Sequence, residues 1–383
     1  MLARILPALL MLMLPMSVMR AQWVAMTSEA DSLMQLGSRH VYNVEFDQAQ
    51  AVFNDVIRRY PEHPAGYFLD AMIEWWRMTI GQTSPAVEAR FLKKLDKVIE
   101  VSDANLVARP KDIASLFFKG GALGYRGRYN ATRNNMLSAA EDGRVALGIL
   151  NDCQKIAPGN HDILLGTGLY NYWAAVLPEK FPALKPVMIF LPKGDKVIGL
   201  AQLKAAARQA RYASVEAKVV LVQAYFDFEK NALEAIEFAR DLHTQYPRNP
   251  AFHRAYGRCL VSLGPIDSAA VVWRDVLNRC LDKWPGYNRN AAREALYYIG
   301  VSLMIRGDLD KALTYFYKCD EACRKIDEDA SGFIIKTNLK IGQIYDMQGK
   351  RDLAIKQYKK LLSWSDNNGS HAEAQRYLAN PYR

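Results

Sequence analysis

Arg254 and Arg258 are the residues of this chain whose type and spacing most suggest specific chemistry. They are four residues apart, so on a helix they would share one face. Two guanidinium groups in that arrangement can hold a carboxylate or a phosphate through paired hydrogen bonds. The alternative is that both arginines are solvated, or that they pair with acids of a neighbouring helix. If the two guanidinium groups are free to hold an anion, the pair predicts binding of an anionic group and not catalysis.

The residue types used in catalysis form no recognisable pattern. The six histidines are scattered, with no HExxH arrangement for zinc: His40, His63, His161, His243, His253 and His371. The glycine clusters at 120, 121 and 124 and at 166 and 168 neither follow a strand nor complete a phosphate-binding loop. We expect these glycines to permit close helix contacts. The sequence therefore predicts no catalytic residue, no cofactor and no metal ligand, and a protein that is not an enzyme.

A repeated spacing defines the elements that must position the arginines. Gly37, Ala49, Phe53 and Pro61 are 12, 4 and 8 residues apart. The same spacing returns at Gly257, Ala269 and Trp273, at Gly300, Ala312 and Phe316, and at Gly342, Ala354 and Tyr358, with a variant at Gln223, Ala235, Ala239 and Pro247. It resembles the tetratricopeptide repeat, in which small residues let two antiparallel helices approach closely and an aromatic ring fills the space beside them. Each pair leaves one apolar face uncovered, so the pairs stack into an all-α, tetratricopeptide-like solenoid.

Helical periodicity and helix-end signals place the expected helices. They are Ser28 to Tyr42, Asp47 to Tyr60, Ala65 to Ile80, Ser84 to Val101, Lys111 to Arg126, Thr132 to Ile156, Asp162 to Leu177 and Lys196 to Arg211, followed by four pairs beginning near Val215, Pro250, Arg293 and Ile334. The distance between equivalent residues grows from 34 (Gln223 to Gly257) to 43 (Gly257 to Gly300) and 42 (Gly300 to Gly342). If the additional residues are helical, the C-terminal units are about two turns longer than the usual repeat.

In this architecture the first helix of each pair lines the concave surface. Counting repeat positions from the repeated glycine gives these candidate partner-binding residues: Arg254, Arg258, Glu294, Tyr297, Lys336, Gln343 and Asp346, with Asp31, Ser38 and Tyr42 upstream. The arginine pair is weakly similar to the carboxylate clamp with which some tetratricopeptide domains hold a peptide C-terminus, although the asparagines of that clamp are absent. The resemblance implies a protein or peptide partner.

A proline-rich insert from Pro178 to Pro192 interrupts the helices, with four prolines in fifteen residues. Proline lacks the amide proton that a helix needs, so we expect no helix to continue through the insert. It contains an apolar run: Val187, Met188, Ile189, Phe190 and Leu191. Either the insert folds back over the solenoid, or it contacts a partner or a membrane surface. Asp195 is then expected to cap the next helix.

The first residues have the features of a secretory signal. Arg4 precedes an apolar run from Ile5 to Val18, which is short for a membrane span. We expect residues 1–21 to be a signal peptide cleaved after Ala21, with Ala25 as the next candidate, and residues 22–383 to form the repeat array. The alternatives are an uncleaved anchor and a buried helix. Export of such a chain suggests a bacterial periplasm or cell envelope.

The positions of the cysteines argue against a lipid anchor, and the net charge indicates the kind of partner. The first cysteine, Cys153, lies far beyond the apolar run, so no lipoprotein anchor is expected, and the five cysteines are expected to be small buried residues. The chain carries a net charge of +10, and without residues 1–21 it carries +8, which favours anionic partners such as acidic peptides, envelope polymers or lipid headgroups. The basic residues form no concentrated tract, and the export signal argues against nucleic acid.

A second resemblance covers residues Ala114 to Leu263. It rests on the segments Gly166 to Tyr172, Leu191 to Asp195 with Gly199, Leu200 and Leu203, and Tyr246 to His253. These segments look like a family of exported bacterial tetratricopeptide proteins, distantly similar to the mitochondrial outer-membrane inclusion-body clearance family. The resemblance implies an all-helical repeat fold and no established enzymatic activity.

We therefore predict a non-catalytic, exported scaffold that binds a protein or peptide on the concave face of Val215 to Tyr358. The alternative is a peripheral contact of the Pro178 to Pro192 insert with a membrane or an outer-membrane protein, in envelope assembly or maintenance.

Overall fold

The chain is helical throughout the part that the structure describes. This is a computed structural model, and it describes residues 27–182, 185–188, 191–330 and 332–383. Within these ranges there is no β-strand, and no helix is both long enough and apolar enough to cross a membrane. The predicted all-α helical-repeat fold is confirmed.

The helices pair antiparallel in chain order, with a short helix in the insert and a five-residue π-helix after α10. They are α1 (Ser28–Tyr42), α2 (Phe46–Arg59), α3 (Pro64–Thr79), α4 (Pro85–Ala108), α5 (Ile113–Thr132), α6 (Met136–Ile156), α7 (Ile163–Lys180), α8 (Lys185–Met188), α9 (Lys196–Gln209), α10 (Ser214–Gln223), η2 (Ala224–Phe228), α11 (Ala232–Gln245), α12 (Pro250–Leu263), α13 (Ile266–Leu281), α14 (Arg289–Ile305), α15 (Leu309–Ile326), α16 (Gly332–Met347), α17 (Arg351–Leu362) and α18 (Ser370–Ala379).

Polar side chains at the helix starts explain why many helices begin where they do. The side chains of Ser84, Asp112, Asp195 and Asn249 each accept a hydrogen bond from a backbone N–H in the first turn of the following helix. Such caps satisfy amides that have no partner inside the helix. The prediction that Asp195 caps a helix is confirmed. At the other end, Gly264 adopts φ 95°, a conformation that glycine tolerates best, and ends α12.

The repeated glycines lie where the predicted spacing requires them, against the aromatic ring of their own unit. A Cβ atom on Gly37 would lie 2.3 Å from Phe53, and one on Gly257 would lie 2.8 Å from Trp273. The same distances are 2.8 Å from Gly300 to Phe316 and 2.5 Å from Gly342 to Tyr358. Any side chain at these positions would collide with a fully buried ring, so the glycines are what allow the two helices of each pair to pack.

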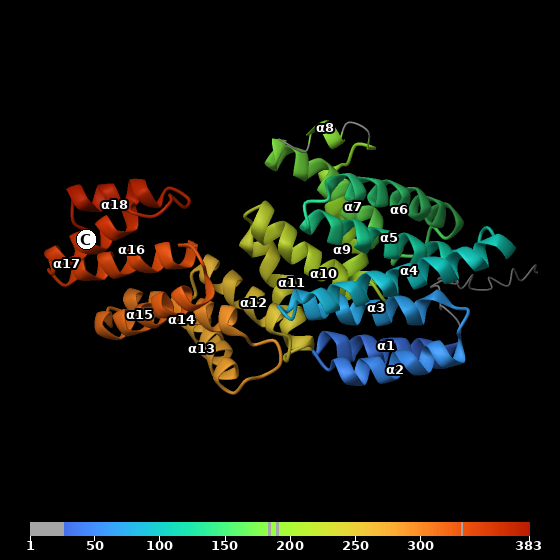
Figure 1. Cartoon of the computed structure of the whole chain (residues 1–383), viewed down its shortest axis with the longest axis horizontal. Coiled ribbons are helices and arrows are strands. Elements are labelled where there is room, and N and C mark those ends of the chain that lie inside the picture. The colour runs from blue at the N-terminus through green and yellow to red at the C-terminus, as the bar shows by residue number, and fades with distance from the viewer. Residues whose placement is uncertain (1–26, 183–184, 189–190, 331) are drawn as a thin grey trace, which may run out of the picture.

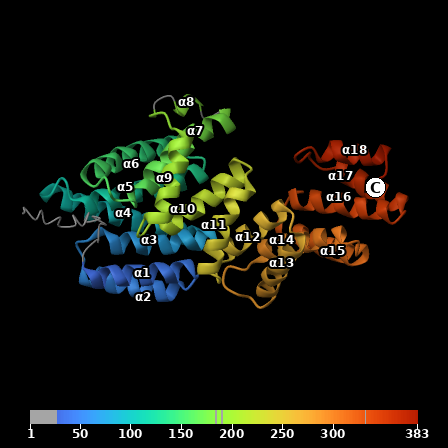
Figure 2. The same ribbon diagram turned by 180° about the vertical axis from the view of Figure 1, so that it is seen from behind.

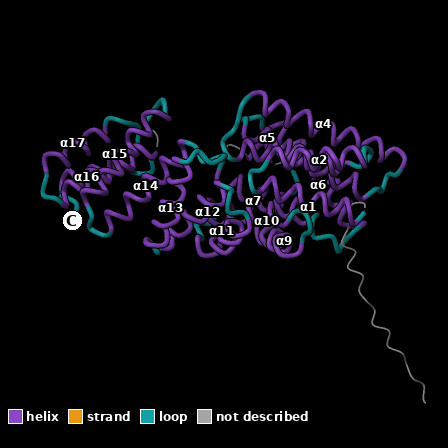
Figure 3. Tube along the Cα trace, turned by 90° about the horizontal axis from the view of Figure 1, so that it is seen from below, coloured by secondary structure: helices purple, strands orange, loops and turns teal. Residues whose placement is uncertain are grey.

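The molecule is elongated and has two parts that differ in how the chain packs (Figure 1). We call α1–α11 the N-terminal body and α12–α18 the C-terminal arm. The reverse view shows the arm extending away from the body, with α10–α12 between α3 and α14 (Figure 2). The view from below shows α10–α12 between α1 and α14 along the long axis (Figure 3).

The first helices of the body contact a region of the chain that runs from the end of α9 to the start of α14, and we call this contact the seam. Polar pairs there join residues far apart in sequence: Asp31 binds Arg211 and Tyr212, Tyr42 and Trp76 bind Glu216, Arg248 binds Glu45, and the side-chain amides of Asn249 and Asn288 donate to the carbonyls of Tyr42 and Ile80. The solenoid is therefore not an open ribbon over its first half.

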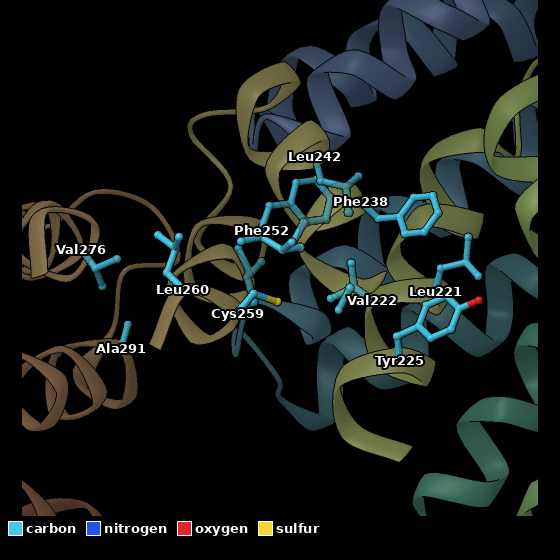
Figure 4. Packing of buried hydrophobic residues seen from close by; sticks show 14 of the residues in the cluster. Leu221, Val222, Tyr225, Phe238, Leu242, Phe252, Cys259, Leu260, Val276 and Ala291 are labelled. Carbon is cyan, nitrogen blue, oxygen red and sulfur yellow. The ribbon is translucent and has the colours of Figure 1, made fainter. Parts of the chain in front are cut away.

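Aromatic packing completes the seam. The ring of Trp76 meets Tyr42 edge-on, with centroids 5.4 Å apart, and meets Phe252 at 5.2 Å. One hydrophobic core runs from these residues into the arm. Figure 4 shows its middle part, where Val222 and Phe252 lie between Leu221 on the body side and Leu260 on the arm side.

One expectation about helix length was wrong, and a second holds only in part. Helix α7 continues through Pro178 and ends at Lys180. A proline this close to the end of a helix removes only one backbone hydrogen bond, because the helix ends two residues later. The additional residues of the C-terminal units are only partly helical. α13 has 16 residues and α15 has 18, compared with 14 in α11, and the remainder of the first long unit forms the connection from Asp282 to Asn288.

Candidate functional site

The structure brings the two predicted arginines together on a single carboxylate of the chain. Arg254 Nε donates to Glu294 Oε2 at 2.6 Å. Arg258 Nε donates to Oε1 of the same group, and its Nη2 donates to Oε2 at 3.1 Å. The arginines come from α12 and the glutamate from α14, so the cluster links two successive repeats. Glu294 is only 1% exposed.

Of the two interpretations of the arginines, pairing with an acid of a neighbouring helix is the one that the structure shows. A buried carboxylate needs this compensation, and removing one partner of a buried pair typically costs about 3–5 kcal/mol. Two guanidinium groups share one carboxylate, so the cluster keeps one positive charge in excess. Both arginine side chains are partly exposed, so this charge faces solvent.

Three other predicted groove residues have internal roles. Tyr297 packs edge-on against Phe316 at 5.9 Å and Phe333 at 5.7 Å, and burial raises its pKa. Gln343 is buried and accepts a hydrogen bond from Lys340 Nζ at 3.0 Å. Asp346 has a fully enclosed side chain.

Asp346 anchors the end of the chain, which explains why it is not exposed in a groove. Its carboxylate accepts hydrogen bonds from Arg351 at 2.9 Å, from the Tyr358 hydroxyl at 2.8 Å and from the backbone N–H of Tyr382 at 2.9 Å. Residues after α18 return over α16 and cover positions that are open in a middle repeat. The prediction of a groove contact at Glu294, Gln343 and Asp346 is thus corrected to three buried structural positions.

Lys336 is exposed, and its neighbour Lys340 was not among the predicted residues. Lys340 lies one turn further along α16, and burial lowers the pKa of its amine. The four-residue spacing from Lys336 was a signal that could have identified it. We call Arg254, Arg258, Lys336 and Lys340 the basic first-helix surface, because they all lie on first helices of helix pairs of the arm.

The corresponding surface in the body is occupied by the chain itself. Glu216 accepts from Trp76 Nε1 at 2.8 Å and from the Tyr42 hydroxyl at 3.3 Å. Burial raises the pKa of Glu216, and the hydrogen bond from Trp76 opposes that change. Asp31 has the opposite shift, because the bond from Arg211 lowers its pKa. Two of the three upstream groove predictions, Asp31 and Tyr42, are therefore seam residues.

A half-buried histidine and a buried one stack at the junction of body and arm. The rings of His243 and His253 are 4.4 Å apart and inclined by 12°. His253 Nδ1 is 3.0 Å from the Tyr287 hydroxyl, and burial lowers the pKa of His253 to about 3. A histidine that stays neutral at every physiological pH is a packing residue, because proton transfer in catalysis needs a pKa near the working pH.

All five cysteines are free, and four of them are buried. Burial raises the pKa of Cys153 to about 12, whereas the hydrogen bond with Cys323 lowers the pKa of Cys319. Cys319 is fully buried, so its thiol is not accessible from solvent. In residues 27–182, 185–188, 191–330 and 332–383, no group of three or more histidine, cysteine, aspartate or glutamate side chains is placed to hold a metal ion.

The predicted contact in the insert falls largely outside the described residues. Ile189 and Phe190 are not described, nor are the side chains of Val187 and Met188, while Leu191 is partly buried. Two described apolar residues nearby are exposed: Phe181, inside the insert, is 52% exposed, and Val197, after it, is 75% exposed.

Comparison with known proteins agrees with the geometry of the arm. Residues 335–368 match the family model of the tetratricopeptide repeat. This segment contains most of α16 and all of α17. The α16–α17 pair is similar to a tetratricopeptide repeat. No curated protein matches the chain significantly.

Solved structures of repeat proteins share the general helical arrangement at low similarity. A thermophilic TPR protein of Thermus thermophilus is 16% identical, with 61% of this chain and 99% of that chain covered and a TM-score of 0.36. A Rap protein complexed with Competence and Sporulation Factor is 14% identical, with coverages of 92% and 98% and a TM-score of 0.42. Yeast Tom70 is 9% identical, with coverages of 92% and 88% and a TM-score of 0.38. These likenesses are too distant to indicate a function.

Proposed function

We propose that this protein is a non-catalytic scaffold that binds an acidic segment of a protein or peptide on the basic first-helix surface of its arm. The observation that carries the proposal is the sharing of the Glu294 carboxylate by Arg254 and Arg258, which leaves one positive charge facing solvent. Lys336 and Lys340 add two more positive charges on the first helix of a later pair. Helical-repeat proteins use this side of the solenoid as an extended binding surface.

The distribution of charge supports the same surface. Residues 250–383 contain 21 lysines and arginines and 15 aspartates and glutamates, a net charge of +6. Residues 27–249 contain 27 and 25, a net charge of +2 over a longer stretch. A positive field of this kind attracts acidic partners and accelerates their association.

The test is selection of binding peptides from a random display library, followed by measurement of their affinity for two matched variants. The surface variant combines Arg254→Gln with Lys336→Glu, and Arg258 still holds Glu294 through both carboxylate oxygens. The control variant combines Lys359→Gln with Lys356→Glu, which makes the same change in charge at exposed positions of α17. We expect acidic peptides that lose about tenfold or more in affinity for the surface variant only. Equal losses in both variants, or no selected peptide, would contradict the proposal.

Reversal of both arginines to glutamate is unsuitable for this test. It would place three carboxylates around a buried position, and like charges without compensation destabilise the fold. Loss of binding by that variant would then report unfolding.

Export of the protein is part of the proposal and is supported by the apolar run from Ile5 to Val18 after Arg4. We place the protein in a bacterial periplasm or cell envelope. Residues 1–30 fused to an alkaline phosphatase that is active only outside the cytoplasm should give phosphatase activity in a bacterial host. Replacement of Leu9 and Leu10 by arginine should abolish it; activity that survives this change would contradict export by this segment.

Two exposed apolar side chains, one in the insert and one after it, favour a second candidate function, a peripheral membrane contact. Phe181 lies near the start of the insert and Val197 follows its end, and both expose apolar surface to solvent. Co-sedimentation with anionic liposomes should decrease when both residues are replaced by serine. Sedimentation that is unchanged by these substitutions, or absent in the native chain, would leave the arm surface as the better candidate.

A further inference from the structure

A pocket of about 460 Å³ opens between α13, α14 and α15, on the second-helix side of the arm. Its floor is apolar and consists of Ile299 and Leu303, both buried. Around the floor are three cationic side chains, Arg274, Arg306 and Lys311, the carboxylate of Asp308 and the ring of Tyr315. Charged groups around an apolar floor can fix the orientation of a small ligand that has both a charged and an apolar part.

The three cations differ in how they are compensated. Arg306 pairs with Asp267, and Lys311 pairs with Asp308 at 2.7 Å. Arg274 forms no ion pair and no hydrogen bond with any residue in the described part of the chain. The pocket therefore offers one guanidinium group, with five donors in a planar fork, that no carboxylate of the described residues occupies.

The next repeat shows that this pocket is not a general property of the fold. Aligning Gly257 with Gly300 makes Tyr317 the counterpart of Arg274, and aligning Gly300 with Gly342 makes Tyr345 the counterpart of Leu303. In that next unit the two tyrosine hydroxyls are 2.6 Å apart and hydrogen-bonded across the equivalent position. Where one repeat closes the space with two rings, the repeat before it has an arginine and a smaller aliphatic side chain.

We propose that the α13–α15 pocket binds a carboxylate carried on a short apolar stem. Arg274 holds the carboxylate, and Ile299 and Leu303 contact the stem. A single negative charge matches the single uncompensated cation, because Asp267 and Asp308 already accompany the other two. The carboxylate belongs either to a small organic acid or to the C-terminus of a peptide. This site is separate from the basic first-helix surface, so the two proposals can fail independently.

Calorimetric titration of the full chain with three probes tests the site. The probes are hexanoate, the peptide Ala-Ala-Ala-Ala-Leu with a free C-terminus, and the same peptide as its C-terminal amide. We expect binding of at least one free acid and none of the amide. Arg274→Ala should weaken that binding about 10- to 100-fold, the range for loss of hydrogen bonds to a charged group. Lys359→Ala is the matched control, because Lys359 is the exposed residue at the same register position on α17.

A pair of exchange variants makes the result independent of general charge effects. Arg274→Tyr with Leu303→Tyr copies the tyrosine pair of the next repeat into the pocket and should abolish binding without loss of helical content. Tyr317→Arg with Tyr345→Leu places the counterparts of Arg274 and Leu303 in the next repeat and should raise the stoichiometry from one site to two.

Each result of the titration decides the proposal. Tighter binding of the free-acid peptide than of hexanoate supports the proposal with a peptide C-terminus as ligand, and the reverse order supports it with a small acid. Absence of binding by both free acids at millimolar concentration, or equal weakening by Arg274→Ala and Lys359→Ala, would overturn it.

Discussion

The body and the arm are built from the same helix pairs, but they differ in which residues hold them together. In the body, Trp76 binds Glu216 across 140 residues of sequence, and Arg211 binds Asp31 across 180. In the arm, the cluster of Arg254, Arg258 and Glu294 spans at most 40 residues, from one repeat to the next. A helical-repeat chain that closes on itself is therefore held together by contacts between distant repeats as well as by contacts between neighbouring ones.

Closure has consequences for both stability and binding. An open solenoid is stabilised by each repeat and its neighbours, so damage in one unit spreads little. The closed body adds contacts between its first and last units, and these contacts occupy the surface that a repeat protein would otherwise offer to a partner. The arm keeps that surface and carries most of the net charge of the described chain.

The largest effect expected from this comparison is that of Trp76→Ala at the centre of the seam. Removing a fully buried tryptophan typically costs about 3–5 kcal/mol of unfolding free energy. It also removes the indole N–H that binds the buried Glu216. Hydrogen exchange read by mass spectrometry should show faster exchange in α10–α12 and unchanged exchange in α16 and α17.

The milder variant Trp76→Phe separates the contribution of the buried ring from that of the hydrogen bond to Glu216. It keeps most of the ring and loses the hydrogen bond, so we expect a loss of about 1–3 kcal/mol. If either variant accelerates exchange in α16 and α17 as much as in α10–α12, body and arm form one cooperative unit and the distinction between them fails.

A smaller effect is expected from pH at the stacked histidines that join the two parts. The pKa of His253 is about 3 in the folded protein because of burial, with His243 and Arg279 adding to the decrease, and about 6.5 in an unfolded chain. Protons therefore bind preferentially to the unfolded state, and stability is lost as the pH falls below about 6.5. Between pH 7 and pH 5 this one residue accounts for a loss of about 2 kcal/mol.

The charged neighbours of the histidines do not reverse this loss of stability at lower pH. Asp275 Oδ2 is 3.6 Å from His253 Nε2, but it also binds Arg279 at 2.8 Å, which limits its support for a charged imidazole. Urea unfolding at both pH values measures the difference, and His253→Phe should reduce it by most of the roughly 2 kcal/mol. An equal pH dependence in the native chain and this variant would show that other groups cause it.

Local features of this fold were predictable from the sequence. The first helix was predicted from Ser28 to Tyr42, and the structure gives the same bounds. The glycine and aromatic spacing identified the packing within each unit, since both partners lie 16 residues apart on one helix pair. Such contacts depend only on neighbouring sequence, where periodicity and capping carry the information.

The seam and the details of the candidate site were not predictable from local sequence. Nothing in the sequence around Tyr42 indicates that Glu216 will lie beside it, because their meeting depends on the accumulated rotation of several repeats. Asp346 was assigned to the groove because the residues that cover it, near Tyr382, follow the last helix. The pocket at Arg274 could have been found from the sequence, because aligning the repeats places Arg274 and Leu303 where the next repeat has Tyr317 and Tyr345.

The smallest effect concerns the rim of the seam, where Arg248 binds Glu45 at 2.6 Å. These side chains are 49% and 22% exposed, and exposed ion pairs typically contribute about 0.2–1 kcal/mol. Arg248 also lies over the ring of Trp284, 6.0 Å from its centroid, so Arg248→Ala alone would remove packing as well as charge. A double-mutant cycle with Glu45→Ala isolates the pair. We expect a coupling energy below about 1 kcal/mol that decreases further at high salt, because screening weakens exposed charges. A coupling above about 2 kcal/mol, several times the usual contribution of an exposed pair, would mean that the rim rather than the buried Trp76 and Glu216 holds the body closed.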